Sequence, residues 1–367
     1  MIRNWQYHNP VKIISGIDSI IYLNSFITKG NWLLVTSSGF SKRGMTELIK
    51  NQLKGVNLLI YDSVSPNPQL DELEYVTLKF RNKSIEGIIA IGGGSVLDAA
   101  KVLSVTICSN LETPLKSILR ESILNEWRSK LPIIVIPTTS GTGAEVTPFA
   151  TVWDKPQRKK YSIVGDKVFP DIALLDPKLT LTLPYYETLY TGLDTISHAL
   201  ESLWNVSRNP ISEMYAEQAL ILSSNALLTL TNNLNDLEAR NNMQQASLFS
   251  GLAITQTRTA IAHSISYPIT SHFDVPHGLA CSFTLPSLIE EYLNFYPKEK
   301  HKKLFETTKE LIESFELHNY ISNYASELEI LSKISEMFHP DRAGNFIMEA
   351  DEKFIAKQIK KSLSYYQ

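Results

Sequence analysis

Four residues in the second half of the chain have the types and spacing of a metal site. Asp194 and His198 lie four positions apart in "GLDTISHAL", so a helix would place a carboxylate and an imidazole one turn apart on one face. For this pair alone, an Asp–His hydrogen bond on a helix surface is the simpler interpretation. His263 and His277 change that, because one carboxylate and three imidazoles suit Zn²⁺ or Fe²⁺ and leave a position for a substrate oxygen.

The stretch "HSISYPITSHFDVPH" carries three of the chain's eight histidines. His263 follows the apolar run "TAIA" on a predicted helix, and Pro276–His277–Gly278 is typical of a turn. His272, between them, is expected on the surface or beside a ligand rather than on the metal.

A glycine-rich turn predicts a phosphate site. "IIAIGGGSVLDAAKV" is a buried strand, then Gly92, Gly93 and Gly94, then a helix that begins at Ser95. Glycines let the backbone approach a phosphate closely, and the helix N-terminus favours an anion. The alternative is a tight strand–helix turn capped by Ser95.

A second turn of this kind is "IPTTSGTGAEVT", which follows another buried strand and offers hydroxyls from Thr138, Thr139, Ser140 and Thr142. Two such turns at strand ends of one sheet suit a dinucleotide. The GxGxxG fingerprint of a standard Rossmann fold is absent.

The elements that must position these residues divide the chain in two. Buried apolar runs at 31–39, 56–64, 86–94 and 131–139 alternate with helical patterns, which predicts a mostly parallel, Rossmann-like sheet. After about residue 180 the long helical patterns 185–205, 211–233 and 237–254 follow without strands. We therefore expect an α/β dinucleotide-binding domain over 1–180 and an all-helical metal-binding domain over 181–367, with the boundary near 176–184.

Composition excludes several classes of function. A net charge of −3 and a pI of about 6.3 give no footprint for nucleic acid or an anionic membrane. Two cysteines, Cys108 and Cys281, are too few for a disulfide framework, and no apolar run reaches about 18 residues. We expect a cytoplasmic enzyme that acts on a small molecule and forms a homodimer or higher homo-oligomer.

Taken together, "GGGSVLD", "IPTTSGTGAEVT", "FPDIALLDP", "TGLDTISHALES" and "PHGLA" resemble, in order and spacing, the iron-containing (group III) alcohol dehydrogenases. The resemblance runs from "YHNPVKIISGIDSI" to "DRAGN". It implies NAD(P)-dependent aldehyde reduction or the reverse oxidation, with Fe²⁺ or Zn²⁺ as a Lewis acid and with proton delivery through water or the cofactor ribose. The implied metal ligands are Asp194, His198, His263 and His277. The implied cofactor contacts are Gly93, Gly94, Ser95, Asp98, Thr138, Thr139, Thr142 and Lys160.

One departure from the family concerns the cofactor. Many members carry Asp at the end of the first strand, where it repels a 2′-phosphate. Here Ser37 takes that place, with Lys42 and Arg43 close behind, which favours NADPH or dual use. The alternative is that Ser37 only caps the next helix.

The other departure concerns the substrate. Where many members have a histidine four residues before the third ligand, this chain has Thr259, and Arg258 stands beside it. The stretch looks most like the phosphonoacetaldehyde reductases, and a guanidinium is the usual partner of a phosphonate. The alternative is that Arg258 is an ordinary surface arginine of the helix. On a continuous helix it would not share a face with His263, so the helix must end or distort there, or Arg258 must reach round from the side. Lys159 or Arg158 would be the alternative cation.

Two other activities stay open. One is reduction of an uncharged short-chain aldehyde, or the reverse reaction of an alcohol or diol. The other is a lyase of the related dehydroquinate synthase type, which expects several cations around the metal, whereas residues 191–280 hold only Arg208, Arg240 and Arg258 as arginines.

Overall fold

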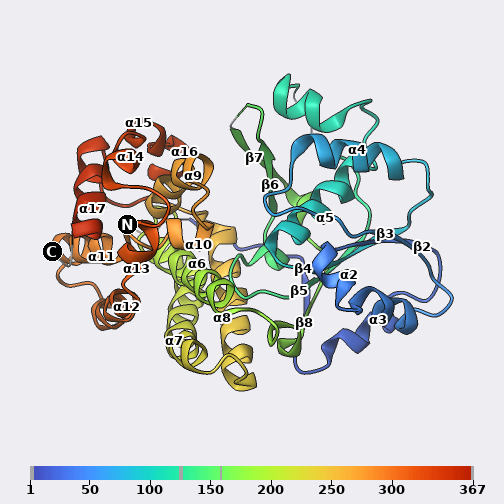
Figure 1. Ribbon diagram of the computed structural model, residues 1–367, viewed down its shortest axis with the longest axis horizontal. Coiled ribbons are helices and arrows are strands. Elements are labelled where there is room, and N and C mark those ends of the chain that lie inside the picture. Colours follow the sequence, from blue (N-terminus) through green and yellow to red (C-terminus); the bar gives the residue numbers. More distant parts are fainter. Residues whose placement is uncertain (1–3, 124–126, 158, 365–367) are drawn as a thin grey trace. The chain divides into compact units, whose positions relative to one another are not determined.

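The computed structural model describes residues 4–123, 127–157 and 159–364. Contacts divide the chain into two compact units. The α/β unit comprises Asn9–Thr139 and Ala144–Thr180, and the helical unit comprises Met1–His8, Ser140–Gly143 and Leu181–Gln367. The prediction of a first α/β part and a second helical part is thereby confirmed (Figure 1).

A six-stranded parallel sheet forms the centre of the α/β unit. Its order is β1-β8-β5-β4-β2-β3. The strands are β1 (Lys12–Ser15), β2 (Asn31–Val35), β3 (Asn57–Tyr61), β4 (Gly87–Gly92), β5 (Ile133–Pro137) and β8 (Ile172–Leu175). The four buried runs found in the sequence are β2, β3, β4 and β5. The sequence analysis did not identify β1 or β8.

Side chains explain why these segments are central strands. Every residue of β4 and β5 is buried, as expected for a parallel sheet covered by helices on both faces. The strand order reverses between β2 and β4, so the carboxyl ends of these two strands form the switch point where ligands of open α/β sheets bind.

The helices of the α/β unit are α1 (Leu23–Phe26), α2 (Ser38–Lys42), α3 (Met45–Gln52), α4 (Leu70–Phe80) and α5 (Gly94–Thr106). Five short 3-10 or π turns accompany them among the described residues, namely Ser19–Tyr22, Lys116–Arg120, Ala144–Val146, Asp166–Val168 and Pro177–Thr180. A separate antiparallel hairpin pairs β6 (Phe149–Asp154) with β7 (Lys159–Val164).

Three long helices form the frame of the helical unit: α6 (Tyr185–Leu203), α7 (Pro210–Asn232) and α8 (Leu237–Thr257). They agree closely with the helical patterns of the sequence. The remaining helices are α9 (Ile261–Phe273), α10 (His277–Ala280), α11 (Leu285–Phe295), α12 (Lys302–Ser314), α13 (Leu317–Ile321), α14 (Glu327–Leu331), α15 (Ile334–Met337), α16 (Pro340–Ala343) and α17 (Glu352–Ser364).

The N-terminal residues up to His8 belong to the helical unit although the α/β unit follows them in the chain. The Tyr7 ring lies 6.0 Å from the Tyr215 ring, centroid to centroid. The Gln256 side-chain amide donates to the His8 carbonyl at 3.2 Å. The helical unit is therefore assembled from separate stretches of sequence.

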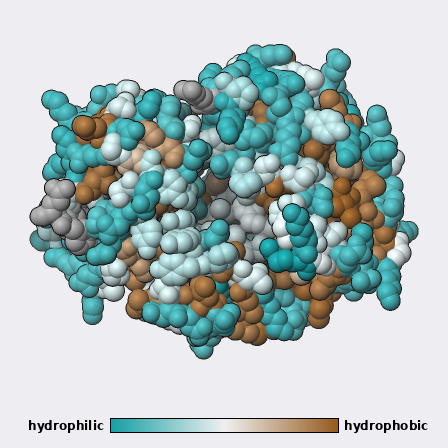
Figure 2. All heavy atoms as spheres, viewed as in Figure 1, coloured by the Kyte–Doolittle hydropathy of each residue, from teal (hydrophilic) through white to brown (hydrophobic). Residues whose placement is uncertain are grey.

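Hydrophobic side chains on the face shown in Figure 2 occur in groups among hydrophilic ones. Within the described residues, every helix is too short or too polar to span a bilayer.

Candidate metal centre

Helix α6 presents three acidic or imidazole side chains on one face. Asp194, His198 and Glu201 occur at positions i, i+4 and i+7, so they follow one another along a single stripe of the helix. All three are buried, and Glu201 is completely so. The apolar residues of α6 that pack in the core of the unit fix this stripe in place.

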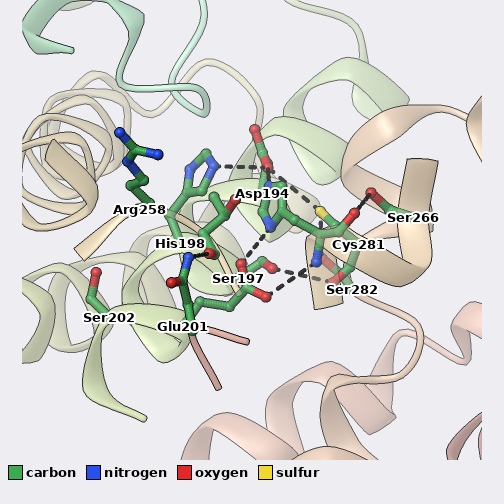
Figure 3. A network of polar contacts seen from close by, with 12 residues as sticks. Asp194, Ser197, His198, Glu201, Ser202, Arg258, Ser266, Cys281 and Ser282 are labelled. Carbon is green, nitrogen blue, oxygen red and sulfur yellow. Dashed lines mark hydrogen bonds and ion pairs between the residues drawn. The ribbon is translucent and has the colours of Figure 1, made fainter. Parts of the chain in front are cut away.

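Helices α9 and α10 bring two more histidines to that stripe. His263 Nε2 lies 3.4 Å from Asp194 Oδ1, and His198 Nε2 lies 3.6 Å from the same oxygen. The His263 ring is stacked on His198 at 4.7 Å and meets His277 edge-on at 5.2 Å, centroid to centroid. All four residues that the sequence suggested as ligands thus converge in one place; Figure 3 shows Asp194 and His198 of this cluster.

These separations fit a divalent ion. Two ligand atoms that each lie about 2.1 Å from a tetrahedral ion are about 3.4 Å apart, close to both measured distances. Among the described residues, His263 Nε2 is buried and has no hydrogen-bond partner. Because a buried polar atom normally has a partner, this nitrogen is a candidate metal ligand.

The charges of the cluster are strongly coupled. Burial opposes ionisation of Asp194, but His198, His263 and His277 hold the pKa of its carboxyl well below the usual range. Burial would also lower the pKa of His263, yet Glu201 and Asp194 raise it to about 9. For His198, burial dominates and lowers the pKa. The two carboxylates therefore favour a positive charge in this cluster, which is also the condition for holding a divalent ion.

Glu201 is a functional candidate that the sequence analysis missed. Its carboxylate accepts a hydrogen bond from the His263 backbone N–H at 3.1 Å, and its other oxygen lies 2.7 Å from His263 Nδ1. A carboxylate that accepts a hydrogen bond from Nδ1 fixes the imidazole tautomer in which Nε2 can bind a metal. The signal was present in the sequence, since Glu201 follows His198 by three residues.

Replacing Glu201 with glutamine is expected to weaken metal binding about 10- to 100-fold, because the amide holds the His263 ring less firmly and adds no negative charge. The measurement is activity as a function of free Fe²⁺ or Zn²⁺ concentration. Excess metal should restore much of the activity. Unchanged metal dependence would show that Glu201 does not orient His263.

Cys281 is the second residue that the sequence analysis did not assign to the cluster. Asp194, His263, His277 and Cys281 each offer a ligand atom, all within 4.8 Å of one another. The Cys281 thiol donates to Asp194 Oδ1 at 3.5 Å. Burial, with Asp194 nearby, raises the pKa of this thiol well above its usual value. His198, whose Nε2 lies 3.6 Å from Asp194 Oδ1, offers a further ligand atom from α6.

His272 lies outside the cluster. Its Nε2 is 2.7 Å from Glu336 Oε2 near the surface of the helical unit. This agrees with the expectation that it does not bind the metal.

The two phosphate-binding turns that the sequence suggests are adjacent in the sheet. Gly92 pairs with Pro137, and the Thr138 N–H donates to the Gly92 carbonyl at 2.9 Å. A Cβ atom on Gly93 would lie 3.2 Å from Thr139 Cγ2, so the turns touch there. At the end of β2, the Thr36 hydroxyl donates to the Ile91 carbonyl of β4 at 2.7 Å. The turns after β2 and β4 thus meet at the switch point of the sheet, and the turn after β5 lies beside them.

The structure places the other predicted cofactor residues individually. Gly93, not Ser95, is the N-cap of α5, and the Ser95 hydroxyl accepts from the Asn67 N–H at 3.2 Å. The alternative that Ser95 caps this helix is therefore wrong. Asp98 is fixed by the Thr151 N–H at 2.9 Å. Lys160 lies in β7, with its ammonium 5.3 Å from the Trp153 ring centre.

Ser37 and Thr142, the last two predicted cofactor residues, lie in different units of the protein. Ser37 directly precedes α2 in the N-cap position, but its hydroxyl makes no capping hydrogen bond, so capping does not explain its presence. Thr142 belongs to the segment Ser140–Gly143, which groups with the helical unit rather than with the other predicted cofactor residues.

Arg258 stands where α8 ends. Its φ is +62°, its N–H donates to the Ile254 carbonyl at 2.7 Å, and α9 begins only at Ile261. The break that the sequence required between Arg258 and His263 is present. The side chain is exposed. Of the alternative cations, Lys159 is an exposed residue of β7, and Arg158 lies outside the described residues.

A cavity of about 590 Å³ opens on Asp194 and His277 within the helical unit. Tyr186, Tyr190, Tyr320 and Tyr324 supply much of its wall, together with Thr142 and Glu187. Neither Arg258 nor any other lysine or arginine lines it. The cavity therefore suits an uncharged molecule better than an anion.

The other two arginines of the stretch 191–280 serve structural roles. Arg240 is almost fully buried and donates to the Leu234 and Leu183 carbonyls and to the Thr188 hydroxyl. Arg208 donates to the Leu203 carbonyl at 2.7 Å. These contacts argue against the dehydroquinate synthase type of lyase, which needs cations for its substrate.

Comparison with known proteins agrees with this architecture. The model of the iron-containing alcohol dehydrogenase family matches residues 10–177, and the model of that family's C-terminal domain matches residues 188–339. The chain is 32% identical over 307 residues to aldehyde-alcohol dehydrogenase 2 of Entamoeba histolytica, a match that covers 80% of this chain but only 34% of that longer protein.

Two further relatives share a name. Sulfoacetaldehyde reductase of Bilophila wadsworthia is 31% identical over 76% of this chain and 73% of its own length. The crystal structure of sulfoacetaldehyde reductase from Bifidobacterium kashiwanohense in complex with NAD⁺ is 26% identical, with a TM-score of 0.86 over 99% of both chains. With both family models matched and the fold shared along its whole length, the chain belongs to the iron-containing alcohol dehydrogenase family.

Proposed function

We propose that the protein reduces a small aldehyde with NAD(P)H in a metal-dependent reaction, and that this aldehyde is phosphonoacetaldehyde, reduced to 2-hydroxyethylphosphonate. The observation that carries the reaction type is the buried cluster of Asp194, His198, His263 and His277. It combines a donor set for Fe²⁺ or Zn²⁺ with the adjacent Glu201, which orients His263.

The chain's own residues have defined tasks in this proposal. When bound, the metal supplies a Lewis acid, and the nicotinamide supplies the hydride. Asp194 and the three imidazoles hold the ion, and Glu201 holds His263 in the required tautomer. Gly93, Gly94 and Ser95 present the α5 N-terminus to the pyrophosphate, with Thr138 and Thr139 beside them. Asp98, Thr142 and Lys160 complete the proposed cofactor contacts.

Ser37 supports the use of NADPH. Ser37 follows β2 at the switch point, and its uncharged hydroxyl makes no hydrogen bond that caps α2. Its side chain therefore carries no negative charge that would repel a 2′-phosphate. Replacing Ser37 with aspartate is expected to lower kcat/KM for NADPH by up to about 100-fold and to change NADH use much less. The measurement is steady-state kinetics with both cofactors. Rejection of NADPH by the unaltered protein would contradict this interpretation.

The position of Arg258 favours a substrate that carries a phosphonate group. It ends α8 with a positive φ, five residues before the proposed ligand His263, and its side chain is exposed. The two relatives named sulfoacetaldehyde reductase act, by name, on an aldehyde that carries an anionic group. The second candidate, an uncharged aldehyde, is favoured by the tyrosine-lined cavity next to Asp194 and His277.

A substrate panel with an Arg258→Ala variant separates these candidates. If Arg258 holds the phosphonate, the variant is expected to lose about 2–5 kcal/mol in kcat/KM for phosphonoacetaldehyde, the range for breaking a desolvated charge pair. Acetaldehyde and lactaldehyde should lose much less. Equal losses on all three would show that Arg258 is structural, and a parent protein that prefers lactaldehyde would favour the uncharged substrate.

A further inference from the structure

An arginine from a distant part of the chain packs on a tyrosine that in turn stacks on one of the proposed metal ligands. The ring of Tyr267 is parallel to that of the ligand His277, with centroids 6.1 Å apart and planes 6° apart. The guanidinium carbon of Arg342, in α16, lies 4.1 Å from the centre of the same Tyr267 ring. Since stacking on an aromatic face leaves the edge of a guanidinium available, Arg342 can still donate in-plane hydrogen bonds to an anion.

The same tyrosine and the same segment also approach the turn that carries Arg258. The Asn345 side-chain amide donates to the Thr259 carbonyl at 2.8 Å, and the Asn205 amide lies 3.4 Å from the Arg258 carbonyl. Burial raises the pKa of the Tyr267 hydroxyl to about 12, and Arg342 and a hydrogen bond with Thr259 oppose that rise. The α8–α9 turn and the α16 segment are therefore tied together around Tyr267.

Neither arginine is neutralised by a carboxylate among the side chains that the structure describes. Arg120, by contrast, pairs with Asp71 and Asp154, and Arg208 lies 3.7 Å from Glu299. Arg342 is half-buried, so its charge is screened less by water than that of a fully exposed residue. Two uncompensated guanidiniums, on the two segments that are tied together around Tyr267, form a local positive field in a protein whose net charge is −3.

We propose that Arg342 is the second cation of an anion subsite whose first cation is Arg258, and that the pair favours a phosphonate dianion over a sulfonate monoanion. The inference rests on the proposed aldehyde reductase function. Charge matching is the physical reason, because a phosphonate that has lost its second proton carries two charges for two guanidiniums, whereas a sulfonate carries one. The tyrosine-lined cavity, which has no cation in its wall, leaves the Tyr267 side of the histidine cluster for the anion.

The test uses the metal-loaded protein at pH 8 with two variants that remove the charge but keep a long side chain over Tyr267, Arg342→Gln and Arg342→Met. If one of them does not fold, the other still answers the question. Lys333→Ala is the control, because Lys333 is a cation of the same unit that pairs with Glu336 near the surface. The substrates are phosphonoacetaldehyde, sulfoacetaldehyde and acetaldehyde, and 2-hydroxyethylphosphonate is also measured as an inhibitor of acetaldehyde reduction.

Removing the Arg342 charge is expected to lower kcat/KM for phosphonoacetaldehyde about 10- to 100-fold, as for the loss of a charge-assisted hydrogen bond. The loss for sulfoacetaldehyde should be smaller, and acetaldehyde and the control variant should be nearly unaffected. Equal losses on all three aldehydes would overturn the proposal.

Inhibition separates a failure of this inference from a failure of the proposed substrate. If the parent protein does not prefer phosphonoacetaldehyde, the substrate assignment fails. The subsite is then still supported if the Arg342 variants weaken inhibition by 2-hydroxyethylphosphonate at least about 10-fold. An inhibition constant that stays the same in these variants refutes the subsite, whatever the substrate is.

Discussion

Replacing His263 with alanine is expected to lower turnover at least about 10³-fold, because the loss of a central ligand removes the Lewis acid, which is worth several kcal/mol. His263 touches every part of the cluster. Its Nε2 lies 3.4 Å from Asp194, its ring contacts those of His198 and His277, and its Nδ1 is held by Glu201. The measurements are kcat and metal content per chain.

The matched control is His272→Ala, since His272 lies on the same helix α9 but pairs with Glu336 away from the cluster. It should keep both metal and turnover. Chelation of the parent protein should remove activity, and Fe²⁺ or Zn²⁺ should restore it. Full activity in the demetallated parent or in His263→Ala would refute the metal mechanism.

Replacing Gly278 with alanine is expected to destabilise the protein by about 3 kcal/mol or more, which is the upper range for overpacking. An added Cβ would lie 1.9 Å from the Tyr190 carbonyl oxygen. This neighbour is backbone of α6, so it cannot rotate away, and α6 and α10 must separate. Because Gly278 follows His277, and Tyr190 precedes Asp194 by one helical turn, the variant should also bind metal more weakly.

Gly39→Ala is the corresponding control, because its Cβ would meet only the flexible tip of Arg43, at 3.6 Å. Urea unfolding should show a large loss of stability for Gly278→Ala and little or no loss for Gly39→Ala. A Gly278→Ala protein as stable as the parent would mean that α10 packs less tightly on α6 than described.

The sequence predicts the long elements well, and the physical reason is periodicity. A strand such as β4, buried on both faces, and a helix of 19 residues such as α6 leave repeated apolar patterns. Strands β1 and β8 are only four residues long, and β6 and β7 form a two-stranded hairpin with partly exposed residues. Such short or half-exposed segments carry too little pattern to be recognised.

The candidate metal site likewise contains some residues that the sequence predicts and others that it does not. Asp194 and His198 are recognisable because their spacing matches one helical turn. Glu201 lies on the same stripe, but a glutamate three residues after a histidine on a helix is ordinary. Cys281 and the Tyr267–Arg342 pair depend on contacts between helices. Such contacts are set by tertiary packing, which a single sequence does not display.

The packing of Tyr7 and His8 in the helical unit has a consequence for biosynthesis. As the chain leaves the ribosome, the α/β unit is complete once Thr180 has emerged, and it can fold while the rest is still being made. The segment that holds Tyr7 and His8 cannot pack until its partners Tyr215 and Gln256 have been synthesised. Nascent chains whose emerged part ends shortly after residue 180 should therefore have a protease-resistant α/β core and an N-terminal end still open to cleavage.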